Sequence, residues 1–478
     1  FFLLAKSTNS CGDVDKAQCI LQEILGECHG IEDKLPSYYL KAAIQQSCGK
    51  GLDAYNTCLT VLSQLGEKIP QSFDITETKN IIEATSKMTR SISDANLLEM
   101  REMEEKLGIT LKFFSLMATV SFFAKRDMHP FLVCRMVQLT MNQGICKYSI
   151  LGFVQYAAML CGNKMAKDIQ SATRIGKAAM FCLKERFHSE DQLPRIYFTY
   201  YGMVAFHTEP LQSCVEMFGQ GFNAGMSIGE SGTAFLNALW QVRALFFAGE
   251  KLSALLEKID IYVELAKQHK NDVTMINIYR DTISTLIDKG ESTSAAANIA
   301  THDKLFDSEV NFFHKAIQSY WLGHNDRCQH YIGKMKEVTE SPNTGRLNIT
   351  ILTFIHGLNT FQLLKKQNTS KLRTIPRAAI SALQTLTSNS EWNFRNKVHL
   401  LEAESSSFNG RHQEAAASYA AAIASARSSR FIHEEGLACE LAGFHHKKIG
   451  DLNSAYNFFN RAKRCYTEWG SRVKVESV

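Results

Sequence analysis

The chain has 478 residues, of which 45% are hydrophobic and 21% charged, as in an ordinary packed soluble protein. Its formal net charge of +5 is small for this length and is spread without a lysine or arginine block, which argues against a nucleic-acid partner. No apolar run approaches the roughly 18 residues of a membrane span, so we expect no membrane span, and the cysteines, interpreted below as free thiols, predict a reducing, cytoplasmic location.

Helical periodicity runs through most of the chain. It has only seven prolines, and apolar residues recur at three- and four-residue spacing in "ALLEKIDIYVELAKQ" (254–268) and "FHKAIQSYWLGHNDRCQHYIGKMKEV" (313–338). The thirteen cysteines mostly lie inside such patterns and lack zinc-ligand spacing, so we interpret them as buried thiols. The sequence therefore predicts an all-α protein.

Weak copies of one helix-pair unit recur from the start of the chain. They are "SCGDVDKAQCILQEI" (10–24), "SCGKGLDAYNTCLTVL" (47–62), "FFAGEKLSALLEKI" (246–259) and "YWLGHNDRCQHYIGKM" (320–335). The residues that mark them are Gly12, Ala17 and Leu21, then Ala54 and Cys58, then Gly249 and Ala254, and finally Gly323 and Cys328. The chain opens on "FFLLAK" without a methionine, and we expect Phe1 to lie inside a longer gene product.

A break in composition divides the chain. The stretch "DKGESTSAAANIATHD" (288–303) is rich in Ser, Ala, Thr and Gly and is typical of a hinge. We therefore expect an N-terminal helical-repeat stack over 1–288, a linker over 289–303 and a C-terminal stack over 304–478. Softer breaks are expected at 68–80 and 339–348.

The clearest repeat units lie at about 391–470. "SFNGRHQEAAASYAAAIASA" (407–426) and "KKIGDLNSAYNFFNRAKRCY" (447–466) share one order of residues at an offset of 40. The matched positions are Gly410, Ala415, Tyr419 and Ala422 in the first unit, and Gly450, Ala455, Phe459 and Ala462 in the second. Glycine permits a tight turn between antiparallel helices, the small residues permit close helix approach, and the aromatic ring fills the groove.

This pattern predicts an α-solenoid of degenerate tetratricopeptide-like helix hairpins, although the period of 40 exceeds the usual repeat of about 34 residues. The alternative is a generic helical bundle with small residues at close crossings. A bundle gives no reason for the glycine–alanine–aromatic order to recur.

Several stretches carry a resemblance to a known family. Residues 391–475, which end in Tyr466, Trp469, Gly470 and a short basic tail, resemble the helical region of large multidomain signalling proteins. The segments 51–70, 131–162, 178–187 and 205–230 look similar to the same region. That family combines a serine/threonine-kinase-like domain, an AAA/STAND-type ATPase, tetratricopeptide-like repeats, a GAF sensor and a histidine kinase. The resemblance implies a connecting region between an ATPase and sensor or kinase modules.

A search for catalytic motifs supports a non-catalytic segment. "QQSCGKGLDA" lacks the first glycine and the Ser/Thr of a phosphate-binding loop, so Gly49 and Gly51 are interpreted as a hairpin turn. Kinase signatures are missing from the sequence. His433 precedes two glutamates as a phosphoacceptor would, but the start of a repeat helix explains it better. His445 and His446 are adjacent, so we expect them on different helix faces rather than on one metal.

Three functions remain open at this point. The first is a signal-relay scaffold that binds a protein or peptide partner, or flanking domains of the same polypeptide, without a catalytic residue, metal or cofactor. The second is a ligand-sensing regulatory domain that controls an attached ATPase or kinase. In that case the aromatic stretch 195–210 is expected to line a cavity, and the alternative is that these rings pack in the core. The third is an enzyme with a scattered site. The stretches 195–202 and 320–331 are our candidates for a recognition face.

Overall fold

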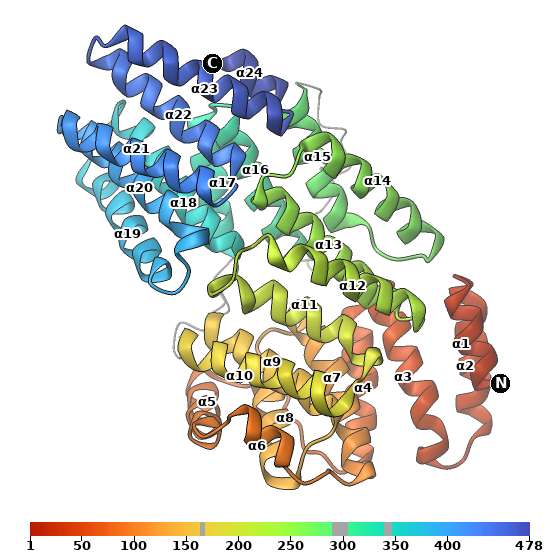
Figure 1. Ribbon diagram of the computed structural model, residues 1–478. Coiled ribbons are helices and arrows are strands. Elements are labelled where there is room, and N and C mark those ends of the chain that lie inside the picture. Colours follow the sequence, from red (N-terminus) through yellow and green to blue (C-terminus); the bar gives the residue numbers. More distant parts are fainter. Residues whose placement is uncertain (163–167, 289–304, 339–346) are drawn as a thin grey trace.

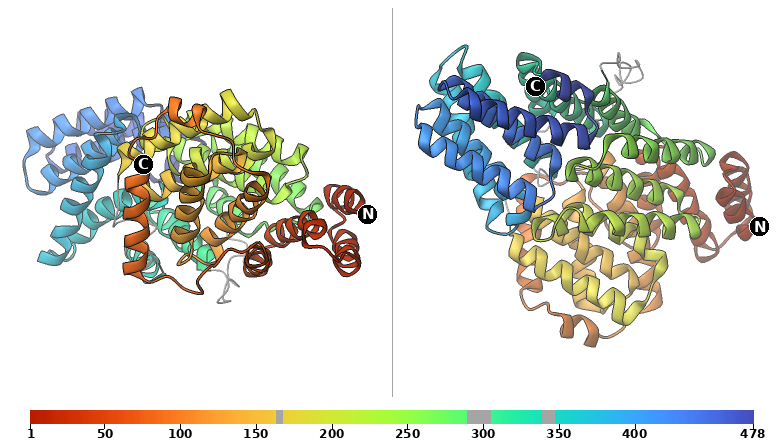
Figure 2. Two further views of the ribbon diagram at one scale, coloured as in Figure 1. Left: turned by 90° about the horizontal axis from the view of Figure 1, so that it is seen from below. Right: turned by 45° about the horizontal axis from the view of Figure 1, so that its top comes forward.

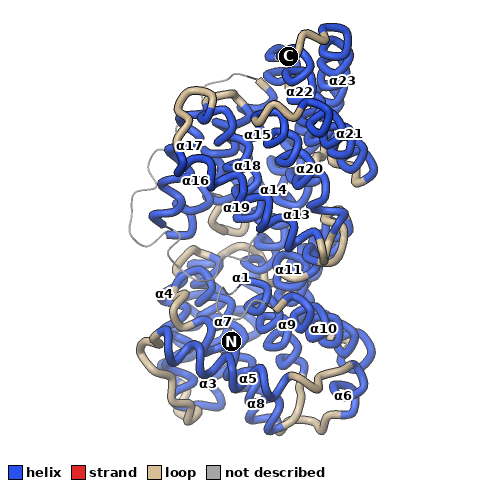
Figure 3. The backbone as a smooth tube through the Cα atoms, turned by 90° about the vertical axis from the view of Figure 1, so that its left-hand side faces the viewer, coloured by secondary structure: helices blue, strands red, loops and turns tan. Residues whose placement is uncertain are grey.

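The computed structural model describes residues 1–162, 168–288, 305–338 and 347–478. The described residues form α-helices with short π and 3₁₀ segments, and their one β-type contact is an isolated bridge between Glu102 and Ile145. The all-α prediction is confirmed, as Figure 3 shows for the described residues.

The helices follow one another with short turns. The first fifteen are α1 (Phe2–Ser10), α2 (Val14–Glu27), α3 (Ile31–Ser47), α4 (Gly51–Gln64), α5 (Ile75–Thr89), α6 (Asp94–Glu99), α7 (Glu105–Ala124), α8 (His129–Gln143), α9 (Lys147–Gly162), α10 (Ile169–Cys182), α11 (Leu193–Met203), α12 (Ser213–Ser227), α13 (Ser231–Ala248), α14 (Leu252–Gln268) and α15 (Thr274–Ile287). The remaining nine are α16 (Leu305–Trp321), α17 (Asn325–Val338), α18 (Leu347–Leu364), α19 (Ser370–Thr387), α20 (Glu391–Phe408), α21 (His412–Ser428), α22 (Ile432–Lys448), α23 (Leu452–Trp469) and α24 (Arg472–Ser477).

Consecutive helices pack as hairpins, and the hairpins stack side by side. In the C-terminal part α16 packs on α17, α18 on α19, α20 on α21 and α22 on α23, while the first helices of these pairs also contact one another in a row. Figure 1 shows this succession from α16 to α23, and both views in Figure 2 place it opposite the α1–α2 pair. This arrangement is that of a solenoid, in which each unit contacts mainly its neighbours.

Glycines close the turns of the two clearest hairpins. Gly410 and Gly450 have φ of +77° and +85°, in the left-handed region that L side chains rarely adopt. In each turn the residue after glycine donates its N–H to a carbonyl five residues earlier, which is the Schellman closure. The same closure, followed by a buried small residue five positions after the glycine, recurs at Gly12, Gly49, Gly229 and Gly323.

One predicted copy differs from this scheme. The turn at Gly249 has the expected backbone, with φ of +84°, but Ala254 is exposed and Leu255 is buried in its place. The hairpin α13–α14 therefore closes like the others without a small residue at that contact. The expectation for Ala254 was wrong because a turn glycine fixes the chain reversal but not the rotation of the helix that follows.

Two helices are more apolar than the sequence analysis recognised. α7 and α18 are long enough for a membrane span, with mean hydropathies of 1.6 and 1.2 over 18 residues. In the structure 67% and 72% of these windows are buried inside the protein. Both are central helices of their hairpin rows, so burial in the protein core explains their apolar composition. That composition indicates no particular cellular location.

The predicted hinge at 289–303 and most of the soft break at 339–348 lie outside the described residues. The helices on either side of the hinge share a hydrophobic core that runs from Leu35 to Trp469. Polar contacts join them as well, since the Asn393 side chain accepts from the backbone N–H of Leu211 at 3.0 Å and donates to the carbonyl of Phe206 at 2.8 Å. The N-terminal and C-terminal helices are thus in direct contact.

Candidate functional site

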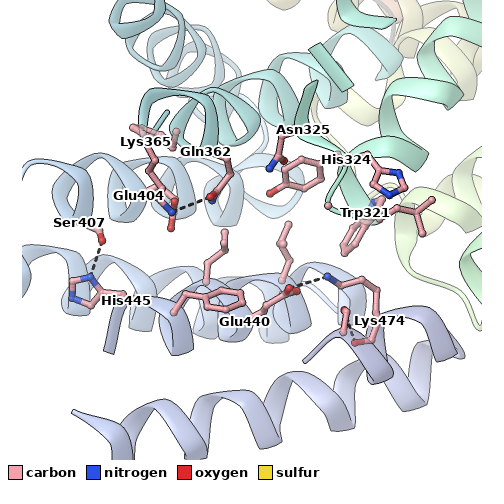
Figure 4. Close-up of a pocket in the computed structure, with 18 of the residues that line it drawn as sticks. Trp321, His324, Asn325, Gln362, Lys365, Glu404, Ser407, Glu440, His445 and Lys474 are labelled. Atoms are coloured by element: carbon pink, nitrogen blue, oxygen red, sulfur yellow. Dashed lines mark hydrogen bonds and ion pairs between the residues drawn. The ribbon is translucent and has the colours of Figure 1, made fainter. Parts of the chain in front are cut away.

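A large cavity lies inside the curve of the C-terminal hairpins. It has a volume of about 1040 Å³ and is lined mainly by α16, α18, α20, α21, α22 and α24. We call it the C-terminal pocket (Figure 4). The curve is closed because the last helices return to α15 and α16: Ser471 donates to the carbonyl of Leu286 at 2.6 Å, and the rings of Trp321 and Trp469 lie 5.1 Å apart.

One wall of the pocket carries a buried carboxylate. Glu404 on α20 is 7% exposed and accepts a hydrogen bond from the hydroxyl of Tyr419 on α21. Burial raises the pKa of Glu404, although the Tyr419 hydrogen bond and the charges of Lys365 and Lys448 oppose this shift. Within the described part of the chain, Glu404 has no basic side chain at ion-pair distance.

A second carboxylate lines the pocket from the neighbouring helix α22. Glu440 on α22 accepts a hydrogen bond from the hydroxyl of Tyr466 and forms an ion pair with Lys474 of α24 at 2.8 Å. All three side chains are nearly or fully buried. Tyr320 of α16 also lines the pocket: burial raises the pKa of its hydroxyl, and the charges of Glu404 and Glu440 raise it further.

The rim of the pocket is open to solvent. His324, Lys365, Lys448 and Phe444 line it and are exposed, with 47% of Phe444 accessible. Lys448 donates to the carbonyl of Ser407 at 3.2 Å and Lys365 to the side-chain oxygen of Gln362 at 2.9 Å. The dashed line beside Glu404 in Figure 4 is this Lys365–Gln362 bond and does not reach the carboxylate.

A buried histidine completes the wall below the rim. His445 of α22 shares a hydrogen bond of 2.8 Å with the hydroxyl of Ser407 on α20. Burial lowers the pKa of His445, and the neighbouring charges of His446, His412 and Lys448 lower it further. The pocket therefore combines aromatic and aliphatic surface with two carboxylates and several cations, a composition suited to binding an amphipathic ligand. Among the described residues, no group of three His, Cys, Asp or Glu side chains is arranged to hold a metal ion.

The predicted repeat positions lie in the hairpins α20–α21 and α22–α23. Ala415, Tyr419, Ala422, Ala455, Ala462, Tyr466 and Trp469 are buried, and Phe459 is half-buried. Gly470 ends α23 in the left-handed conformation. Of this set only Tyr419 also lines the pocket, so these positions build the scaffold around the site rather than the site itself.

The structure separates the two candidate recognition stretches. Tyr320, Trp321 and the residues up to Asn325 line the C-terminal pocket. The stretch 195–202 instead lies in the core, where Arg195 is 1% exposed and Phe198 packs on Trp240 with ring centroids 5.1 Å apart. A cavity of about 40 Å³ touches Phe198, Thr199 and Met203, which is little more than room for water.

The three histidines that the sequence analysis considered lie in α22 and are buried or half-buried. His433 is buried near the start of α22 between Trp321 and Trp469, and burial lowers its pKa to about 4. His446 contacts Asp451 at 3.1 Å, whereas its neighbour His445 contacts Ser407. Gly49 lies in the turn between α3 and α4 with φ of +75°.

Sequence reasoning missed the two pocket glutamates. In "HLLEAESS" and "ACELAG" they look like ordinary helical residues, and their partners follow 15 to 34 positions later. The available signal was that Glu440 is the one charged residue in the small and apolar run "GLACELAG" (436–443). Because charged residues are almost never fully buried unless they are paired, burial of this run would require a partner for Glu440.

A smaller cavity lies in the N-terminal stack. It has a volume of about 440 Å³ and lies between the start of α4 and the helices α7, α13, α14 and α15. Phe123, Leu239 and Ile276 form its apolar wall, and Lys50 and Asp53 stand at its polar side.

No protein-family model matches the chain, and no curated protein is significantly similar to it.

Proposed function

We propose that the chain is a non-catalytic scaffold of helical repeats that relays signals within a larger ATPase- and kinase-containing signalling protein. It would do so by binding a protein or peptide partner, or a flanking domain of the same polypeptide, in the C-terminal pocket. The observation that carries this proposal is the open cavity of about 1040 Å³ enclosed by four stacked hairpins and a capping helix.

The shape of the cavity supports a peptide-sized occupant. Its volume is at the upper end of small-molecule sites, and its walls come from hairpins that are stacked in a row. A segment bound across them would contact several units at once. Because each unit packs on the next, an occupant that favours one curvature of the stack would bias the contacts at both ends.

A pocket-blocking variant tests the proposal. Gln362→Trp places a large ring at the half-buried wall of the pocket, while Gln413→Trp places the same ring on an exposed position of α21 outside it. Peptides selected from a random displayed library against the purified chain are expected to bind the parent and Gln413→Trp, but not Gln362→Trp. Equal binding to all three proteins, or no selected peptide at all, would reject the proposal.

A ligand-sensing role is the second candidate, and the N-terminal cavity favours it. Its volume of about 440 Å³ and its apolar wall fit a small ligand with one polar group. A screen of small apolar carboxylates and amines by thermal shift, with Leu239→Trp as the blocked variant, would separate this role from peptide binding.

A further inference from the structure

Buried carboxylates in the described part of the chain follow one rule with one exception. Five glutamates are buried: Glu309, Glu404, Glu434, Glu435 and Glu440. Four of them form an ion pair with a basic side chain, at 3.0 Å for Arg126–Glu309, 2.7 Å for Lys397–Glu434, 2.6 Å for Arg427–Glu435 and 2.8 Å for Lys474–Glu440. Glu404 has only the hydroxyl of Tyr419.

The exception matters because a buried charge without a counter-charge is costly. The ordinary solution is a paired cation, and the other four glutamates have one. Glu404 differs from them in a second way, since it lines the large pocket and a ligand can reach it. The missing counter-charge and the open space are therefore in the same place.

Glu440 shows what an occupied site of this kind looks like. Its carboxylate accepts from the Tyr466 hydroxyl and from the ammonium of Lys474, and that ammonium lies 5.2 Å from the centre of the Tyr466 ring. Glu404 likewise accepts a hydrogen bond from a tyrosine hydroxyl, but no ammonium among the described residues pairs with it. Tyr320 and Tyr419 also line the pocket, and their rings offer an aromatic surface that suits a cation.

We propose that the C-terminal pocket binds a peptide segment that inserts a lysine side chain against Glu404. This inference rests on the proposed peptide-binding function and names the group that the pocket recognises. The lysine ammonium takes the position that Lys474 takes at Glu440, and its alkyl chain packs on the aromatic walls.

The rim defines the neighbours of that lysine. Lys365 and Lys448 are exposed there and are held by Gln362 and by the carbonyl of Ser407, respectively. Their charge disfavours a partner that is basic throughout. The matching segment therefore has acidic residues beside its lysine to meet the rim, and apolar side chains to meet Phe408, Phe444 and Leu441.

Matched peptides test the inference on the purified 478-residue chain. The probe is the fluorescein-labelled peptide Glu-Leu-Lys-Phe-Glu with blocked ends, compared with the same peptide carrying norleucine in place of lysine. We expect the lysine peptide to bind the parent about ten- to a hundredfold more tightly, as for the loss of one charge-assisted hydrogen bond. Equal affinity of the two peptides would overturn the inference.

Two variants assign the effect to Glu404. Glu404→Gln keeps an acceptor for the Tyr419 hydroxyl and removes the charge, so it is expected to abolish the preference for lysine. Glu402→Gln is the control, because it makes the same change two residues away on α20 at a half-exposed position outside the pocket. Loss of preference in both variants, or in neither, would contradict the assignment.

Further outcomes distinguish a failure of the lysine inference from a failure of the proposed peptide binding. If both peptides bind equally and Gln362→Trp blocks both, peptide binding stands and the lysine inference falls. If neither peptide binds while selected library peptides bind and are blocked, the inference falls and the proposed function again stands. If n-butylammonium alone displaces the probe at the peptide's own affinity, the occupant is a small amine and the peptide inference is wrong.

Discussion

The hairpins α20–α21 and α22–α23 are built on the same sequence unit, but only one of the two buried glutamates that they supply to the pocket has a basic counter-ion. Each supplies the pocket with a buried glutamate that accepts a tyrosine hydroxyl, Glu404 with Tyr419 and Glu440 with Tyr466. Only Glu440 has a counter-ion, Lys474, and that lysine comes from the capping helix α24. The comparison shows that the described part of the chain supplies a cation for the pocket glutamate of the last hairpin and supplies none at ion-pair distance for that of the hairpin before it.

Removing the counter-ion from the complete hairpin is expected to have the largest effect. Lys474→Met would leave Glu440 buried with only the Tyr466 hydroxyl, which would make it resemble Glu404. Breaking a buried ion pair costs about 3 to 5 kcal/mol, and we expect the urea midpoint to fall accordingly.

The double variant Glu440→Gln/Lys474→Met is the control for this prediction. It removes both charges, so most of the lost stability should return. An unchanged midpoint for Lys474→Met alone would show that Glu440 needs no cation, and the distinction between the two hairpins would disappear.

The second hairpin also closes more tightly. At the 40-residue offset, Ala403 of α20 corresponds to Gly443 of α22. A β-carbon on Gly443 would lie 2.6 Å from the Phe459 ring, which is an overlap. We expect Gly443→Ala to cost about 1 to 3 kcal/mol of stability by overpacking.

A helical glycine without such a neighbour provides the comparison for Gly443. Gly333 in α17 has nothing within 4 Å of its β-carbon position, so Gly333→Ala should gain up to about 1 kcal/mol from helix propensity. Both changes are measured as shifts of the urea midpoint. A gain at both positions would mean that the Phe459 ring moves aside freely.

The turns of the two hairpins should respond alike. Gly410 and Gly450 both have positive φ, and neither has an atom within 4 Å of a built β-carbon. Gly410→Val and Gly450→Val therefore introduce backbone strain without a clash, at a cost of roughly 1 to 2 kcal/mol each. A melting temperature equal to that of the parent for either variant would contradict the role of that glycine.

The repeat scaffold was predictable because its signals are local. The turn glycine, the small residue five positions later and the aromatic ring are close together in the sequence, and they identify the starts of α21 and α23. The irregular segments of the N-terminal part, such as the π-helical turn at Leu183–Phe187, carry no comparable pattern. Their conformation depends on packing against distant helices, which a single sequence does not reveal.

The pocket was predictable only in part. The stretch 320–331 was a candidate for a recognition face, and its first residues, 320–325, line the cavity. Glu404, Glu440 and Lys474 were not expected there. Their grouping requires that α24 return to α15 and α16, and this closure depends on contacts such as Ser471 with Leu286 that span 185 residues.

The smallest expected effect concerns the charge of Glu404 in the free protein. Burial raises its pKa, so the folded state binds a proton on this group more readily than the unfolded state does. By linkage, the ionised group lowers stability at neutral pH, and this penalty fades as the pH falls through the raised pKa and then the unfolded value. Glu404→Gln is therefore expected to be slightly more stable than the parent at pH 7, with the difference shrinking in acid.

Urea midpoints of the parent and Glu404→Gln between pH 7 and pH 4 measure this difference. The groups that act on Glu404 or respond to its charge are Tyr320, Lys365, Tyr419 and Lys448, and all of them are present in both proteins, so subtraction isolates the one carboxyl. The opposite sign, a variant less stable than the parent at pH 7, would mean that Lys365 or Lys448 already neutralises Glu404 in solution. In that case Glu404 in the hairpin α20–α21 would already have a counter-ion, as Glu440 has in α22–α23. An incoming lysine would then have to displace that cation.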